Sequence, residues 1–166
     1  ALVFSVARRI VESDSFCRKG KFEGWGPMLM LGQDISKKTL GIIGAGRIGT
    51  AMALKSKGFD MNVLYVNPEH NSDLESDLDA QKTDLSTLLS KSDIISLHVP
   101  LTDETYHLIG EKELDSMKEN AVLVNTSRGP VIDANALINA LESNQIFGAG
   151  LDVYEQEPKI PKRLKQ

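Results

Sequence analysis

The sequence predicts an α/β protein with a doubly wound parallel sheet. Two observations lead to this fold class. Short apolar runs that suit buried strands alternate with stretches of helical periodicity along most of the chain. A glycine-rich turn also lies between one of these runs and the helix that follows it. Because each parallel strand needs a crossover to reach the next, this alternation favours a parallel sheet with helices on both faces.

The composition is that of one ordinary globular domain. The chain has 166 residues, of which 41% are hydrophobic and 25% charged, enough for a single well-packed core. The net charge of −4 provides no basic surface for nucleic acid or an anionic membrane, and no apolar run approaches the length of a membrane span. Cys17, the only cysteine, cannot form an internal disulfide, which is compatible with a reducing compartment. We expect a cytoplasmic protein without a metal site.

The N-terminal part is predicted to be a helix followed by a loop. Val3, Val6, Ala7 and Ile10 share one helical face, so residues 1–12 are predicted to form a helix, which starts as if it had been cut from a longer element. Residues 20–32 contain four glycines and a proline, which indicates a loop with apolar anchors. Trp25 is expected to be one of these packing anchors.

The stretch from Lys38 to Thr50 organises the rest of the chain. The apolar run 40–43 suits a strand buried on both faces, and the G-x-G-x-x-G pattern of residues 44–49 follows directly, before a helix-compatible segment. Gly44 permits the tight turn, Gly46 lets the backbone approach a pyrophosphate, and Gly49 lets the helix lie close to the strand. The free N–H groups of Arg47 and Ile48 at the helix start would favour the same anion. This context predicts a Rossmann-type dinucleotide-binding turn, and a glycine turn in another α/β unit is the alternative.

The next segments continue the alternation of strands and helices. Gly58 is expected to break the helix that follows the glycine turn, and residues 61–66 are predicted to form a second strand. Asn67-Pro68 ends this strand because proline cannot join the ladder. The polar residues 69–79 are interpreted as a surface excursion. Asp84 can cap a short helix, and residues 93–99 form the next buried strand.

The C-terminal third repeats the same pattern. Residues 111–118 are predicted to be helical and residues 121–125 to form a strand. Asp133 can cap a helix whose apolar stripe comprises Ala134, Leu137, Ile138 and Leu141. The last strand, residues 148–153, begins with small residues, which indicates that another element packs close to it. Residues 159–166 are interpreted as a tail.

In a doubly wound sheet the ligand lies outside the carboxyl ends of the strands. The residues that follow each predicted strand are therefore the candidate site. These are Gly44 to Gly49, Asn67, His98 to Pro100, Thr126 to Arg128, and Asp152.

Four of these segments together resemble one family. Residues 41–49 (GIIGAGRIG), 96–102 (SLHVPLT), 124–133 (VNTSRGPVID) and 148–158 (GAGLDVYEQEP) are similar to the D-isomer-specific 2-hydroxyacid dehydrogenases. Among these, the glyoxylate and hydroxypyruvate reductase branch is the most similar. The resemblance implies a cofactor-binding domain over residues 1–158, excised from a two-domain enzyme that works as a homodimer. The substrate domain of the family is absent from this chain.

The resemblance also implies roles for particular residues. Arg128 would bind the carboxylate of a 2-oxo acid and polarise its keto oxygen, which suits the planar fork of a guanidinium. Glu157 matches the glutamate that pairs with the acid/base histidine, and that histidine lies beyond this chain. Asp152 matches the aspartate that holds the nicotinamide carboxamide, although an ordinary turn residue remains the alternative. Further cofactor contacts are implied at His98, Pro100, Thr105, Thr126 and Ser127, and the chain alone is expected to be inactive.

The choice between NAD and NADP depends on Asn67. An acidic residue at this position would bind both ribose hydroxyls and repel a 2′-phosphate, whereas asparagine carries no charge. No Arg or Lys follows it, since Pro68 and Glu69 come next. The sequence therefore favours NAD modestly, with NADP still usable.

Two functions of different classes agree with these motifs. The first is an oxidoreductase that transfers a hydride between NAD(P)H and a small 2-oxo acid such as glyoxylate or hydroxypyruvate. The second is a dehydrogenase-like corepressor that senses the nucleotide and uses it to control assembly. Nothing in the sequence indicates a peptide-docking or nucleic-acid surface, so the enzyme is favoured.

Overall fold

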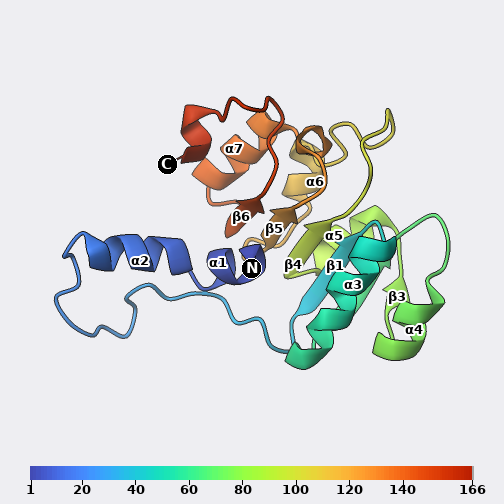
Figure 1. Ribbon diagram of the computed structural model, residues 1–166, viewed down its shortest axis with the longest axis horizontal. Helices are drawn as coiled ribbons and strands as arrows, with labels where there is room; N and C mark the ends of the chain where they lie inside the picture. The colour runs from blue at the N-terminus through green and yellow to red at the C-terminus, as the bar shows by residue number, and fades with distance from the viewer. Residues whose placement is uncertain (166) are drawn as a thin grey trace.

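The structure, a computed structural model, describes residues 1–165. It contains a single six-stranded sheet whose strands are parallel throughout, in the order β3-β2-β1-β4-β5-β6 (Figure 1). This confirms the predicted doubly wound sheet. The strand bounds are β1 Thr39–Ile43, β2 Asn62–Val66, β3 Gln81–Lys82, β4 Ile94–Leu97, β5 Val122–Asn125 and β6 Gly148–Leu151.

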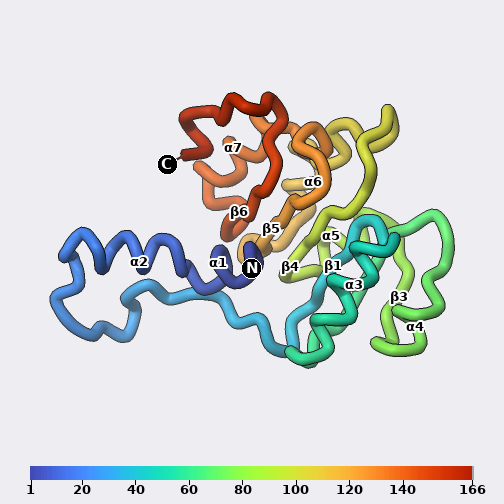
Figure 2. The backbone as a smooth tube through the Cα atoms, viewed as in Figure 1, coloured from blue at the N-terminus to red at the C-terminus, as the bar shows by residue number. Residues whose placement is uncertain are grey.

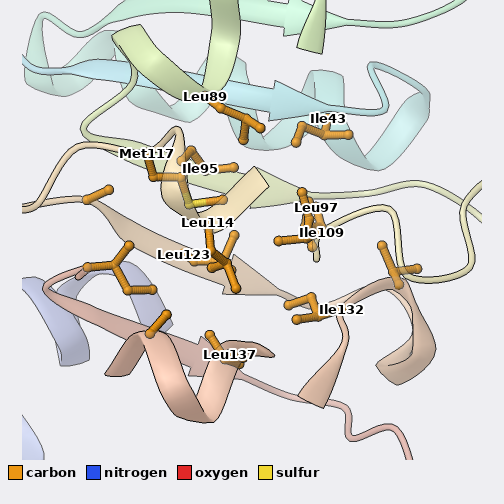
Figure 3. Close-up of a cluster of buried hydrophobic side chains, with 14 of the residues drawn as sticks. Ile43, Leu89, Ile95, Leu97, Ile109, Leu114, Met117, Leu123, Ile132 and Leu137 are labelled. Carbon is orange, nitrogen blue, oxygen red and sulfur yellow. The ribbon is translucent and has the colours of Figure 1, made fainter. Parts of the chain in front are cut away.

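Helices cover both faces of the sheet, because neighbouring apolar residues of each strand point to opposite faces. On one face, β1 contributes Ile42 to a core shared with α1 (Leu2–Ala7), α3 (Arg47–Ser56) and α4 (Ser72–Leu78). On the other face, Ile43 joins Leu89, Leu114, Leu123 and Leu137 in a core with α5 (Leu85–Lys91), α6 (Glu111–Asp115) and α7 (Ala134–Glu142), as Figure 3 shows. Three short 3-10 turns complete the elements: Lys57–Phe59, Gly129–Val131 and Lys162–Lys165.

The predicted helix caps are present in the structure. The Asp84 carboxylate accepts a hydrogen bond from the Thr87 N–H (2.9 Å), and the Asp133 carboxylate accepts from the N–H groups of Asn135 and Ala136 (2.9 and 3.1 Å). The stripe expected on α7 is largely inward, with Leu137 and Ile138 buried. Both helices therefore begin where the sequence predicts.

The N-terminal segment forms two helices instead of the single predicted helix. After α1 the chain turns at Arg9, whose φ is +52°, and α2 runs over Ile10–Arg18. The turn occurs here because the Ala7 carbonyl accepts a hydrogen bond from the Gln33 N–H (2.7 Å) as the chain returns past it. Ile10, expected on the buried face, is 49% exposed as a result.

The small residues at the start of β6 do allow a close approach, as expected. A Cβ on Gly148 would lie 2.8 Å from a Val6 methyl carbon, and a Cβ on Gly150 would lie 2.9 Å from the Leu2 Cβ. The element that packs there is α1. The N-terminal helix of this chain therefore covers its own edge strand.

The predicted surface excursion at residues 69–79 contains helix α4. The Asn71 side chain caps this helix by accepting from the Leu74 N–H (3.1 Å), and Leu74 is completely buried. One buried leucine in a polar segment gives too weak a periodic signal to predict a helix, but the asparagine cap three residues before it was a usable sign. The two-residue edge strand β3 was also missed, because it is too short to form a pattern.

The loop after α2 lies outside the body of the domain. Figure 2 shows the chain from α2 to β1 extending away from the sheet. Trp25 is 86% exposed, so the prediction that it anchors the loop inside this chain was wrong. Its apolar neighbours are exposed as well, and they are Phe22, Met28, Leu29 and Leu31. These five apolar side chains of the loop therefore remain exposed in the part of the chain that the structure describes.

Candidate functional site

The glycine turn joins β1 to α3 with the predicted geometry. Gly44 has a φ of +94°, a conformation that side chains disfavour, and a Cβ on it would lie 2.8 Å from the His98 carbonyl carbon. A Cβ on Gly49 would lie 2.1 Å from the Gly44 carbonyl oxygen, so this glycine lets the helix approach the turn. These two glycines therefore fill the packing roles that the motif predicts.

Gly46 differs from the other two glycines, because nothing lies within 4 Å of the position that its Cβ would occupy. No side chain caps the N-terminus of α3 at this residue. The first N–H groups of the helix, at Arg47 and beyond, have no partner within the helix and face open space together with its positive dipole end. The turn thus presents a cradle that fits a pyrophosphate.

His98 follows β4, at the point where the strand order reverses beside β1. Its backbone N–H donates to the Ile43 carbonyl (2.8 Å), and its Nε2 lies 2.9 Å from the Ser96 Oγ. Burial lowers the pKa of the imidazole below its usual value. His98 is therefore neutral near neutral pH, and it forms the wall next to the glycine turn.

Arg128 is held in place by a small polar network after β5. The Asn125 side chain, which is buried, donates to the Arg128 carbonyl (2.9 Å) and accepts from the N–H and Oγ of Ser127 (2.9 and 2.8 Å). The guanidinium remains exposed, with Nη1 on the Ser127 carbonyl (2.7 Å). Sequence reasoning did not single out Asn125, although a polar residue at the end of an apolar strand was a usable signal.

Gly129 brings the Arg128 turn against the segment that carries Glu157. A Cβ on Gly129 would lie 2.0 Å from the Tyr154 carbonyl oxygen, so only glycine allows these two backbones to touch. Glu157 is exposed, and its Oε1 accepts from the Tyr154 N–H (2.8 Å). The structure therefore places the two predicted catalytic residues on adjoining segments.

Glu155 and His107 fasten the Glu157 segment to the domain. His107 Nε2 lies 2.8 Å from one Glu155 carboxylate oxygen, and the other oxygen accepts from the Ala134 N–H at the start of α7 (3.0 Å). His107 also stacks on Tyr106. The sequence alone made Glu155 look like a solvated tail charge, because its partner lies 48 positions away.

Four other predicted site residues lie at the same edge: Pro100, Thr105, Thr126 and Asp152. They differ in whether other groups of the chain already occupy their polar atoms. Thr126 and Asp152 are exposed, and the Asp152 N–H donates to the Asn125 carbonyl (3.0 Å). Thr105 donates its hydroxyl hydrogen to the Pro100 carbonyl (2.6 Å) and accepts from the Thr102 N–H (2.8 Å). The Thr105 hydroxyl thus shapes its own loop, whereas the side chains of Thr126 and Asp152 are open to a ligand.

Asn67 lies at the end of β2, next to a second link to the glycine turn. Its Nδ2 donates to the Glu69 carbonyl (3.1 Å). Nearby, the Asn71 side chain donates to both the Ala45 carbonyl (2.9 Å) and the Thr50 Oγ1 (2.8 Å). The loop that follows β2 is therefore tied directly to the turn that would hold a pyrophosphate.

A large hollow lies elsewhere. It measures about 960 Å³ and is open to solvent, between α1, edge strand β6 and the C-terminal turn, and its lining includes Leu2, Gly150 and Leu164. None of the candidate residues lines it. The candidate site is the carboxyl edge of the sheet, because the predicted site residues converge there.

Two further features concern metals and membranes. Within residues 1–165, no group of three or more His, Cys, Asp or Glu side chains is arranged to hold a metal ion. No helix in that range is long and apolar enough to cross a membrane.

The fold and the site together define a class of protein. A doubly wound parallel sheet with a glycine turn, an open helix N-terminus and polar residues at its carboxyl edge is a dinucleotide-binding domain. The family can be named as well. The family model of the D-isomer specific 2-hydroxyacid dehydrogenase NAD binding domain matches residues 1–166, and the chain belongs to this family.

Individual relatives agree with this assignment. The glyoxylate reductase of Thermococcus litoralis is 55% identical over 168 residues, covering 99% of this chain and 51% of the relative. D-lactate dehydrogenase from Aquifex aeolicus, solved with NAD and lactic acid, has a TM-score of 0.87 at 34% identity over 98% of this chain and 51% of its own. An acyclic imino acid reductase solved with NADPH and D-Arg has a TM-score of 0.85 at 39% identity, over 96% and 50%. The chain thus spans about half the length of the relatives it matches.

Proposed function

We propose that this domain serves an enzyme that reduces small 2-oxo acids, with glyoxylate as the first candidate substrate, using NADH or NADPH. One observation carries the proposal. The glycine turn and Arg128 lie at the same carboxyl edge of one sheet, the first open to a pyrophosphate and the second presenting a guanidinium held by Asn125. The similarity to a glyoxylate reductase supports the choice of substrate.

The residues of this chain would divide the work as follows. When bound, the nicotinamide would supply the hydride for the keto carbon. The free N–H groups at the start of α3 would bind the pyrophosphate, and Asn67 would hydrogen-bond the adenosine ribose. Asp152 and Thr126 are exposed where the nicotinamide end would lie. Arg128 would hold the substrate carboxylate with two parallel hydrogen bonds and stabilise charge that develops on the keto oxygen.

Glu157 is proposed to orient the acid/base group. Its carboxylate accepts a hydrogen bond from the Tyr154 N–H of its own loop. A carboxylate beside an imidazole raises the pKa of the imidazole and lets it donate a proton near neutral pH. We assign the proton-donating histidine to a part of the protein outside residues 1–166, and the chain alone is therefore proposed to be inactive.

The test is turnover by the complete protein. Purified protein is mixed with glyoxylate, hydroxypyruvate or D-lactate and the matching cofactor, and the nicotinamide absorbance is followed. We expect reduction of glyoxylate or hydroxypyruvate. Tight cofactor binding without turnover of any small 2-oxo acid would favour a nucleotide-sensing protein instead.

We also propose that the protein is a cytoplasmic homodimer. The loop 20–32, called the arm from here on, lies outside the domain body (Figure 2). Several of its apolar residues are exposed. Apolar side chains gathered on an extended segment favour burial against a second subunit. The single cysteine, Cys17, is exposed and free, as suits a reducing compartment.

A further inference from the structure

A lysine from the neighbouring strand lies beside the end of β2. Lys82 belongs to the short edge strand β3 and pairs in register with Tyr65 of β2. Its Nζ donates a hydrogen bond to the carbonyl of Pro68 (2.6 Å), the residue that directly follows Asn67. The sequence shows no basic residue after Asn67, but the sheet brings one there from 15 positions further along the chain.

The charges around Lys82 leave its ammonium available. Within residues 1–165, no carboxylate lies within ion-pair distance of it, and its one hydrogen-bond partner is the neutral Pro68 carbonyl. An ammonium carries three donors, so two remain for another acceptor. The side chain is thus a cation fixed at the end of β2 without a counter-charge in contact.

One acidic group of this region, Glu75, is already engaged by other partners. Glu75 Oε1 accepts from the Tyr65 hydroxyl (2.5 Å) and lies 2.7 Å from His70 Nδ1. The Tyr65 hydrogen bond, followed by the His70 contact and more weakly by the charge of Lys82, lowers the pKa of this carboxyl. Glu69 turns its carbonyl to Asn67 and leaves its side chain exposed to solvent. Lys82 is the cation that the structure places in contact with the Pro68 backbone.

We propose that Lys82 binds the 2′-phosphate of NADPH and so determines how well the domain accepts the phosphorylated cofactor. The inference rests on the proposed function in one respect, because it requires the adenosine ribose to bind at Asn67. A phosphomonoester there would meet the Lys82 cation on one side and the neutral Asn67 amide on the other, because asparagine stands at the position where an acidic residue would repel the phosphate. The domain then uses both cofactors because Asn67 can hydrogen-bond a ribose hydroxyl while Lys82 offsets the phosphate charge.

The test compares Lys82→Gln with wild type in the complete protein. Glutamine keeps an N–H donor on a side chain one atom shorter and has no charge, so it removes the cation with a small change in size. Dissociation constants for NADPH and NADH are measured by fluorescence titration without any 2-oxo acid. Adenosine 2′,5′-bisphosphate and 5′-AMP serve as probes that isolate the 2′-phosphate. Lys91→Gln, an exposed lysine at the end of α5, is the matched control.

We expect Lys82→Gln to weaken NADPH and adenosine 2′,5′-bisphosphate about 10-fold or more, the scale of one hydrogen bond to a charged group. Binding of NADH and 5′-AMP should change less than about 2-fold, and Lys82→Arg should retain NADPH binding. The salt dependence of NADPH affinity should also decrease in Lys82→Gln.

An unchanged affinity for NADPH in Lys82→Gln would overturn the inference. Equal losses of affinity for NADPH and NADH would overturn it as well, because they would indicate a structural role for Lys82. Because binding is measured without substrate, this result is independent of whether the protein turns over 2-oxo acids. Binding of both cofactors without turnover would refute the proposed function. The role of Lys82 would still be decided by comparing the NADPH and NADH affinities of Lys82→Gln with those of wild type.

Discussion

At the scale of single residues, the position of Arg128 depends on neighbours that are not themselves reactive. Asn125 fixes the Arg128 carbonyl, and Gly129 permits contact with the Tyr154 backbone. The guanidinium itself remains exposed. The buried side chain of Asn125 thus positions the turn, and the charged side chain of Arg128 can face solvent and a bound substrate.

Arg128→Lys in the complete protein should reduce kcat/KM for glyoxylate by at least ~10²-fold, the scale for loss of one donor to a developing oxyanion. Lysine keeps the charge but cannot form two parallel hydrogen bonds to a carboxylate. Steady-state kinetics will measure this, with Arg18→Lys as the control, since Arg18 is exposed on α2 and pairs with Asp14. Equal kcat/KM in the two variants would place Arg128 outside the reaction.

His98 should make the stability of the domain depend on pH. Burial lowers the pKa of its imidazole, so the unfolded chain binds a proton more readily than the folded one. The contribution is therefore fully present above about pH 6.5, the ordinary histidine pKa, and is lost as the pH falls through the window below it. Urea unfolding of wild type and His98→Gln between about pH 5 and 8 measures the difference. The variant should lose less stability on acidification, and parallel pH profiles would contradict the assignment.

At the scale of elements, the turn between β1 and α3 assigns different tasks to its glycines. Gly49 is needed for packing, because a Cβ there would overlap the Gly44 carbonyl oxygen. Gly46 faces open space, so a methyl group there would meet only a ligand. One motif therefore combines a requirement of the fold with a requirement of binding.

These tasks can be separated by two alanine substitutions. Gly49→Ala should lower the Tm by several degrees, since a destabilisation of about 1 kcal/mol shifts Tm by roughly 2–8 °C in domains of this size range. Gly46→Ala should leave the Tm within about 1 °C of wild type but weaken NADH binding, because its methyl group would occupy the cradle. Thermal melts and fluorescence titration measure both effects, with Gly58→Ala as a control at another open position. A large loss of Tm in Gly46→Ala would show that the space at this residue is part of the packing.

At the scale of the whole molecule, the chain contains one compact sheet domain and an arm with nothing to cover it. The helix α1 packs on β6, so its apolar face is used within the chain. The arm exposes Phe22, Trp25 and Met28 at 56%, 86% and 74%. We accordingly place the proposed dimer contact on the arm.

Replacing Trp25 and Met28 together by serine should shift the complete protein from dimer to monomer at micromolar concentration. Aromatic anchors carry much of the binding energy of an interface, and removing one commonly costs ~2 kcal/mol or more. Sedimentation equilibrium measures the change, with Phe59→Ser as a control at a partly exposed apolar residue outside the arm. A wild-type protein that is monomeric would refute the dimer itself.

The sequence by itself determined the fold class, the position of most strands and the glycine turn. Buried parallel strands are apolar along their whole length, and capping side chains lie next to the helices they start, so both leave local signals. Asp84 and Asp133 are examples, and the packing roles of Gly44 and Gly49 could also be predicted. The same local logic placed the candidate site residues at the carboxyl ends of the strands.

Only the tertiary structure decided the features that depend on distant partners. The break at Arg9 depends on Gln33, the environment of Glu155 depends on His107, and the cation beside Asn67 comes from Lys82. The exposure of Trp25 likewise follows from the path of the loop and not from its composition. A sequence pattern records what each residue prefers from its neighbours along the chain, whereas these contacts exist only after the sheet has brought separate segments together.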